Sequence, residues 1–118
     1  MTKTIMVVDD EPDVRLTIRK IFEKNKYKVI EAANGDECLE KLQKVKPDLI
    51  LMDVMMPGTE LMEVIPKIKD IKILYLSVVK EAEASKAGLL NQENIMGYFQ
   101  KPFQVDLLIK KVNGILGG

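Results

Sequence analysis

Short apolar runs alternate along this chain with stretches in which apolar residues recur every three or four positions. The runs cover residues 5–8, 27–30, 49–52, 73–76 and 98–99. The first, third and fourth are apolar at nearly every position, which is typical of strands buried on both faces. The pattern therefore predicts short parallel strands covered by helices.

The stretches between these runs have the periodicity of amphipathic helices. A first helix is expected from Pro12 and a second behind the turn signal Asn34-Gly35. Further helices are expected over residues 60–69, 80–90 and 104–116, and Pro66 should shorten or kink the third. The predicted inward faces of the first, second and last helices are Val14, Ile18, Ile21 and Phe22; Cys38, Leu39, Leu42 and Val45; and Val105, Leu108, Ile109, Val112, Ile115 and Leu116.

Strict alternation of strands and helices with short connections predicts an α/β fold, with a five-stranded parallel sheet and helices on both faces. A chain of 118 residues, 47% of them hydrophobic, is the size of one domain with a real core. We also expect Met52, Met56, Met62, Phe99 and Phe103 to lie in or near that core.

Composition excludes several kinds of site. The chain has 18 basic and 18 acidic residues, so the basic excess usual in nucleic-acid-binding domains is missing. It has no histidine and one cysteine, Cys38, which rules out a Ser-His-Asp triad, a disulfide framework and a cysteine zinc site. We expect Cys38 to be a buried structural thiol. No apolar run approaches the length that spans a membrane, and we predict a cytoplasmic protein.

Polar residues follow four of the predicted strands. Asp9 and Asp10 come directly after the first strand, Asp53 after the third, Ser77 after the fourth and Lys101 shortly after the fifth. Because ligands of such folds bind at the carboxyl ends of the strands, these side chains should meet at one rim of the sheet. Taken singly, each also fits a structural role, such as a helix cap or a turn.

Three adjacent carboxylates would raise one another's pKa unless a cation lay between them. Oxygen ligands without histidine or cysteine suit Mg²⁺, with Mn²⁺ as an alternative. A metal, a lysine and a hydroxyl around one carboxylate suit phosphoryl transfer, in which an Asp can be the nucleophile. The chain lacks the glycine-rich phosphate loops G-x-x-x-x-G-K-[ST] and G-x-G-x-x-G, so a nucleotide site is not supported.

The segments "VVDDE", "DLILMDVMMPG" and "YFQKPF", together with Ser77, resemble the receiver (CheY-like) domains of two-component response regulators. Order and spacing match over essentially the whole chain. The resemblance implies a flavodoxin-like (βα)5 fold with strand order 2-1-3-4-5. It also implies that residues 1–118 form a single receiver domain, either alone or as part of a longer regulator.

The resemblance also implies roles for individual residues. Asp53 matches the phospho-accepting aspartate, and Asp9 and Asp10 match the acidic pair that holds Mg²⁺, with Asp10 as the direct ligand and Asp9 in support. Asp53 and the backbone carbonyl of Met55 would complete the metal site.

Ser77 matches the hydroxyl, and Lys101 the amine, that contact the phosphoryl group in this family. Tyr98 matches the aromatic residue that moves inward with Ser77 when the domain switches. A cis peptide bond is implied before Pro102.

The implied function is a signalling domain that a histidine kinase phosphorylates and that changes its fourth-helix, fifth-strand and fifth-helix face. A downstream effector or a linked output domain would read that face. The domain would catalyse only its own phosphorylation and dephosphorylation, without binding nucleic acid or membrane. The apolar stripe of the last helix is compatible with a phosphorylation-dependent homodimer. A receiver-like module that does not switch, and a Mg²⁺-dependent phosphohydrolase, stay open as alternatives.

The chain departs from the family pattern in three places. Leu61 replaces a frequent glycine in the segment after Asp53, which should change the shape of that loop. Val78 follows Ser77 where the family prefers Ala or Gly, which should narrow access to the phosphoryl group. Asn94 and Ile95 stand where a Gly-Ala pair is usual before the last strand, and we expect Asn94 to end the fourth helix in a left-handed conformation.

Overall fold

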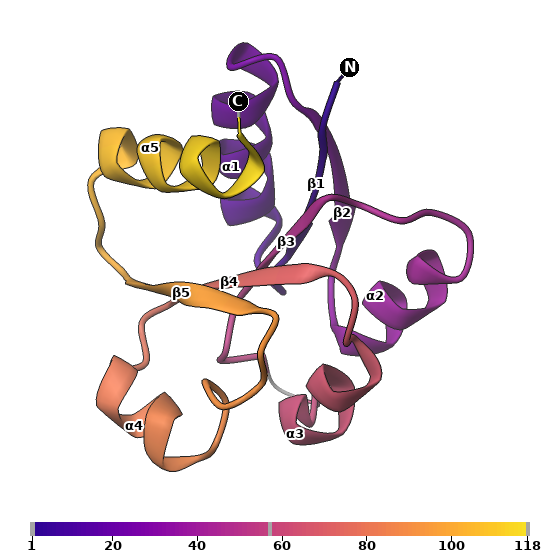
Figure 1. Cartoon of the computed structure of the whole chain (residues 1–118), viewed down its shortest axis with the longest axis vertical. Helices are drawn as coiled ribbons and strands as arrows, with labels where there is room; N and C mark the ends of the chain where they lie inside the picture. The colour runs from indigo at the N-terminus through magenta and orange to yellow at the C-terminus, as the bar shows by residue number, and fades with distance from the viewer. Residues whose placement is uncertain (1, 57, 118) are drawn as a thin grey trace.

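The computed structural model describes residues 2–56 and 58–117. Five parallel strands form one sheet in the order β2-β1-β3-β4-β5, as the resemblance implies (Figure 1). The predicted strands are all present. The second begins one residue later than predicted and ends two later, the third has the predicted bounds, and the other three are longer than predicted. Their bounds are β1 Thr4–Val8, β2 Lys28–Ala32, β3 Leu49–Met52, β4 Lys72–Ser77 and β5 Ile95–Gln100.

Helices cover both faces of the sheet. The helices are α1 Pro12–Lys24, α2 Gly35–Leu42, α3 Leu61–Val64 with the 3₁₀ turn Ile65–Lys67, α4 Glu81–Lys86 and α5 Val105–Leu116. Buried residues of α1 and α5 share one hydrophobic cluster with the sheet, and buried residues of α2, α3 and α4 share the other. In Figure 1, α1 and α5 accordingly lie together on one side of the sheet. The α/β prediction is confirmed.

Three predicted helices are shorter in the structure. The third ends at Val64 and continues as one 3₁₀ turn, because Pro66 has no N–H to give to an α-helical hydrogen bond. The fourth covers six residues instead of the predicted 80–90, and the chain then turns at Gly88 with φ of +84°. The second ends at Leu42, so placing Val45 on its inward face was wrong.

Burial agrees with most of the predicted core, but placing Val105 on the inward face of the last helix was wrong, because it is 42% exposed. Cys38, Met52 and Met56 are buried, as expected. Met62 is 51% exposed, so its placement in the core was wrong. Helix α3 is very short, and its buried residues are Leu61 and Val64. Met62 lies between them and points away from the sheet.

The prediction for Asn94 was also wrong. Among the described residues other than glycine, a positive φ occurs at Lys26 and not at Asn94. The side chain of Asn94 instead donates to the carbonyls of Ile68 and Ile71, both at 2.7 Å. Gln92 donates to the Ile68 carbonyl as well, at 2.7 Å, and to Asn94 Oδ1 at 2.8 Å. We call this pair of side chains the amide clamp. It ties the segment before β5 to the segment before β4.

Candidate functional site

The residues that follow β1 and β3 lie side by side because these strands are neighbours in the sheet. The Asp53 amide donates to the Val8 carbonyl at 2.9 Å, which continues the ladder to the last residue of β1. One carboxylate oxygen from each of Asp9, Asp10 and Asp53 consequently lies within 4.8 Å of the other two. Three oxygen donors at this spacing form a group that fits a hard cation such as Mg²⁺.

Asp9 is 3% exposed, and its polar atoms are bonded in three directions. Its Oδ1 accepts from the Glu11 amide at 2.9 Å, and its Oδ2 accepts from Lys101 Nζ at 3.1 Å. Its backbone carbonyl accepts from Arg15 Nη1 at 2.7 Å. Asp9 is therefore held in one orientation by the start of α1 and by the residue that follows β5.

Asp53 is 7% exposed, and its Oδ1 accepts from the Met55 amide at 3.1 Å. Burial raises the pKa of Asp53, and the neighbouring charge of Asp9 raises it further. The Met55 amide, Lys101 and the Ser77 hydroxyl lower the pKa but do not offset burial. The ionised form of Asp53 is thus under-stabilised by the protein alone, and a bound cation would favour it.

A pocket of about 310 Å³ opens over Asp10 and Asp53. Asp10 is exposed at this pocket, unlike its buried neighbours Asp9 and Asp53. The pocket is lined by Asp10, Glu11, Val14, Asp53, Met55, Val78 and Lys101. The position of Val78 in this lining fits the expectation that its side chain narrows access to Asp53.

The remaining predicted site residues lie at the ends of β4 and β5. The Lys101 amide donates to the Ser77 carbonyl at 2.7 Å, which fixes the start of the loop after β5 beside β4. Ser77 is buried, and its Oγ accepts from the Val79 amide at 3.2 Å. The Lys101–Pro102 peptide bond is cis.

Tyr98 on β5 lies half-buried beside the same loop. Its hydroxyl donates to the Val79 carbonyl, and its ring packs against that of Tyr75 with the centroids 5.9 Å apart. Burial raises the pKa of Tyr98, so the hydroxyl keeps its proton and acts as a donor at neutral pH. Tyr98 therefore connects β5 to the loop between Ser77 and α4.

Two helix-cap roles that the sequence allows for site residues are absent from the structure at α1 and α4. The N-cap position of α1 is Glu11, so Asp10 is not the helix cap. The N-cap position of α4 is Lys80, so Ser77 does not cap that helix either. Both polar side chains are left for the rim of the sheet.

Sequence reasoning missed Arg15 and Glu31. Glu31, near the end of β2, accepts from Arg15 Nε at 3.1 Å and from Arg19 Nη1 at 2.9 Å, while Arg15 also reaches the Asp9 carbonyl. A signal was present, because Arg15 and Arg19 are four apart next to the apolar face of α1. Their partner Glu31, on strand β2, could not be predicted from that spacing.

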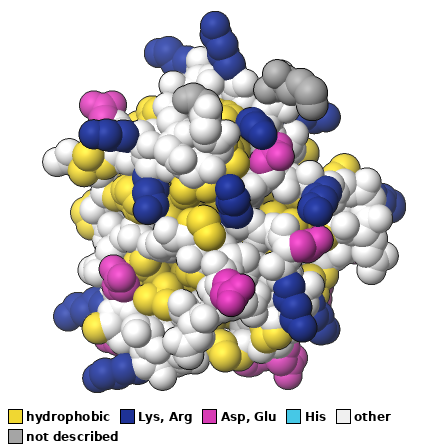
Figure 2. All heavy atoms as spheres, in the orientation of Figure 1, with side chains coloured by type: hydrophobic (Ala, Val, Ile, Leu, Met, Phe, Trp, Pro, Cys, Tyr) yellow, Lys and Arg dark blue, Asp and Glu magenta, His cyan; other side chains and the backbone are white. Residues whose placement is uncertain are grey.

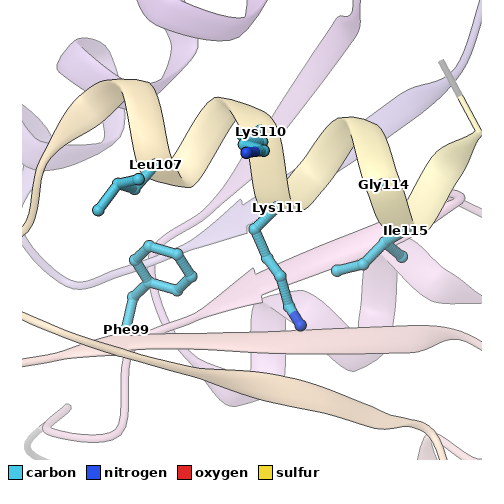
Figure 3. A pocket seen from close by; sticks show the side chains of 6 residues that line it. All are labelled: Phe99, Leu107, Lys110, Lys111, Gly114 and Ile115. Carbon is cyan, nitrogen blue, oxygen red and sulfur yellow. The ribbon is translucent and has the colours of Figure 1, made fainter.

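A second surface feature lies away from the acids. Figure 2 shows hydrophobic side chains gathered across the face on which β5 lies, with Lys and Arg side chains among them. A groove of about 580 Å³ runs between β5 and α5, lined by Phe99, Leu107, Lys110, Lys111, Gly114 and Ile115. In Figure 3, Phe99 and Leu107 lie toward one another at one end, and Lys111 extends from α5 toward β5. This face combines apolar area with positive charge.

Comparison with known proteins gives a consistent result. The family model described as "Response regulator receiver domain" matches residues 5–113. The chemotaxis protein CheY of Thermotoga maritima is 32% identical over 98% of this chain and 98% of its own length. The transcriptional regulatory protein ResD of Bacillus subtilis is 35% identical over 95% of this chain, which spans 47% of ResD. The chain thus covers nearly all of some relatives and about half of others.

A solved structure agrees with these matches. The response regulator protein TrrA of Thermotoga maritima, in complex with Mg(2+)-BeF, has a TM-score of 0.81 and 32% identity to this chain. The match covers 97% of this chain and 99% of TrrA.

Among the described residues, no helix is long and apolar enough to cross a membrane.

Proposed function

This chain belongs to the response regulator receiver domain family, and we propose that it accepts a phosphoryl group on Asp53 in a Mg²⁺-dependent reaction. Receiver domains are signalling domains of two-component systems and not enzymes that act on metabolites. The observation that carries the proposal is the group of three carboxylates within 4.8 Å, one of them bonded to Lys101. We further propose that residues 1–118 act as one receiver domain.

Asp10, Asp53 and the backbone carbonyl of Met55 would hold Mg²⁺, and Mn²⁺ suits the same oxygen donors. The bound ion would neutralise charge on the acids and on the incoming phosphoryl oxygens. Both carboxylate oxygens of Asp9 are already engaged, by the Glu11 amide and Lys101. This arrangement supports a role for Asp9 in holding the site instead of ligating the ion directly.

In the proposed reaction, a carboxylate oxygen of Asp53 bonds to the phosphorus of a phosphohistidine as the P–N bond breaks. The imidazole nitrogen leaves with the electron pair. Lys101 Nζ would turn from Asp9 to the phosphoryl oxygens, and the Ser77 hydroxyl, whose oxygen accepts from the Val79 amide, would turn to donate its proton to the same oxygens. Such charge-assisted hydrogen bonds are stronger than neutral ones, which would drive the exchange.

Movement of Ser77 would release the loop that Tyr98 holds through the Val79 carbonyl. We propose that the face formed by α4, β5 and α5 changes in this way and is read by an effector protein or a linked output domain. The phosphoryl donor would be a histidine kinase. The lysine-flanked groove between β5 and α5 supports a protein partner or a second copy of this chain at this face. A cytoplasmic location stays a prediction.

The experiment is incubation with acetyl phosphate and Mg²⁺, followed by intact mass measurement. Wild type should gain one phosphoryl group, and neither Asp53→Asn nor wild type in EDTA should do so. Equal modification of Asp53→Asn would exclude Asp53 as the acceptor. Beryllofluoride with Mg²⁺ should move the amide resonances of α4 and β5, which a receiver-like module that does not switch would leave in place. Turnover of a generic phosphoester would instead favour a phosphohydrolase.

A further inference from the structure

We infer that Arg15 is a positioning residue for the metal site, an inference that rests on the proposed function. Its Nη1 donates to the backbone carbonyl of Asp9 at 2.7 Å. That carbonyl belongs to the peptide group that joins Asp9 to Asp10. Because a peptide group is planar and rigid, a bond that fixes its carbonyl also fixes the direction of the Asp10 Cα at its other end.

This constraint matters most for Asp10. The Asp9 carboxylate has its own bonds, to the Glu11 amide and to Lys101. Asp10 is exposed, and its side chain therefore depends on the backbone for its direction. A ligand that is already aimed at the cation loses less conformational entropy on binding than one that must be ordered.

Arg15 is itself held from the sheet. Its Nε donates to Glu31 Oε1 on β2 at 3.1 Å, and its side chain is 16% exposed. Partial burial would raise the pKa of Glu31, but hydrogen bonds from Arg19 and Arg15 outweigh burial and lower that pKa. Glu31 is thus ionised at neutral pH and anchors the guanidinium between β2 and the β1–α1 turn.

The same ion pair explains how an arginine can lie beside a cation site. A free guanidinium near three carboxylates would compete with a metal for them. Arg15 instead directs one edge to a neutral carbonyl and another to Glu31, whose charge compensates its own. Lys101 differs, because it bonds the Asp9 carboxylate directly. Arg15 orients the acids without occupying their oxygens.

Arg19 provides a matched control. It lies one turn further along α1 and also bonds Glu31, at 2.9 Å, but its other bond goes to Glu23 on the same helix. Its side chain is 43% exposed. Arg15 and Arg19 thus both fasten α1 to β2 through Glu31. The bond to the Asp9 carbonyl comes from Arg15.

The test is an NMR titration of the phosphate-free protein with Mg²⁺, following the Asp10 and Asp53 amides, for wild type, Arg15→Met and Arg19→Met. Thermal unfolding in EDTA is measured beside it. Arg15→Met should weaken Mg²⁺ binding about tenfold, the lower end for loss of a group that orients metal ligands. Arg19→Met should bind Mg²⁺ as wild type does. Arg15→Lys, which can reach the carbonyl but cannot bond Glu31 with a planar fork, should fall between them.

Unchanged Mg²⁺ affinity in Arg15→Met, or equal losses in Arg15→Met and Arg19→Met, would overturn this inference alone. A wild-type protein that binds no Mg²⁺ would overturn the proposed function, and the inference with it. If Arg15→Met fails to fold, Arg15→Lys decides the question, because wild-type affinity in that variant contradicts the need for the two-sided bond.

Discussion

The two halves of the rim are held in different ways. We call the β1–α1 turn with Asp9, Asp10 and Arg15 the metal half, and residues 77–90 the α4 half. The metal half continues into a helix of 13 residues that buries Ile18 and Phe22, and its polar groups are bonded to β2 and to the loop after β5. The α4 half continues into a helix of six residues that buries Ala84.

Two tyrosine hydroxyls hold the α4 half to the sheet. Tyr98 donates to the Val79 carbonyl before α4, and Tyr75 donates to the Leu89 carbonyl after it, at 2.9 Å. Little apolar area fastens the helix between these two points. Since local opening is easiest where few apolar contacts must break, we expect the metal half to stay in place while the α4 half moves.

The largest difference between the halves should appear when each helix loses a buried side chain. Phe22→Ala should lower the free energy of unfolding by about 4 kcal/mol, since it leaves a cavity in a closed core. Ala84→Gly should lower it by about 1.5 kcal/mol, from helix propensity and one lost methyl group. Urea unfolding measures both values. Similar losses would mean that α4 is anchored as firmly as α1.

The next largest effect concerns the amide clamp, which lies in the segment between α4 and β5. Asn94→Ala should lower the free energy of unfolding by about 2 kcal/mol, because the Ile68 and Ile71 carbonyls lose a donor. Asn91→Ala removes an exposed amide from the same loop and should change it by less than about 0.5 kcal/mol. Chemical denaturation of both variants tests this. Equal effects would show that the clamp contributes nothing specific.

A smaller effect is expected from the hydroxyl that holds the start of α4. Tyr98→Phe should cost about 1 kcal/mol, the net value of one hydrogen bond. Amide hydrogen exchange should become faster at residues 79–86 and stay unchanged at residues 9–15. Faster exchange in both stretches would contradict the independence of the two halves.

The smallest effect concerns the pH dependence of stability without metal. Burial raises the folded-state pKa of Asp53 above its ordinary value of 3.8, so the folded protein binds this proton more tightly than the unfolded chain does. Stability from this group is therefore present below the ordinary pKa and is lost as pH rises through the folded pKa. In EDTA, Asp53→Asn should unfold at a higher temperature than wild type at pH 7, and the gap should shrink toward pH 3. Added Mg²⁺ should stabilise wild type more than the variant.

The sequence by itself determined the strands, the two helical layers and the meeting of the acids at one rim. Apolar periodicity is a local property, and parallel strands necessarily place their carboxyl ends along one edge. For that reason Asp9, Asp10 and Asp53, which are up to 44 residues apart in the chain, can be assigned to one site from the sequence alone.

Only the tertiary structure decided how the rim and the opposite edge of the sheet are held. The bonds from Arg15 to the Asp9 carbonyl, and from Asn94 to the carbonyls of Ile68 and Ile71, join a side chain to backbone groups on other segments. Such bonds depend on the relative placement of segments, which no local period encodes. The exposure of Met62 has the same cause, because the length of α3 decides which of its side chains can reach the sheet.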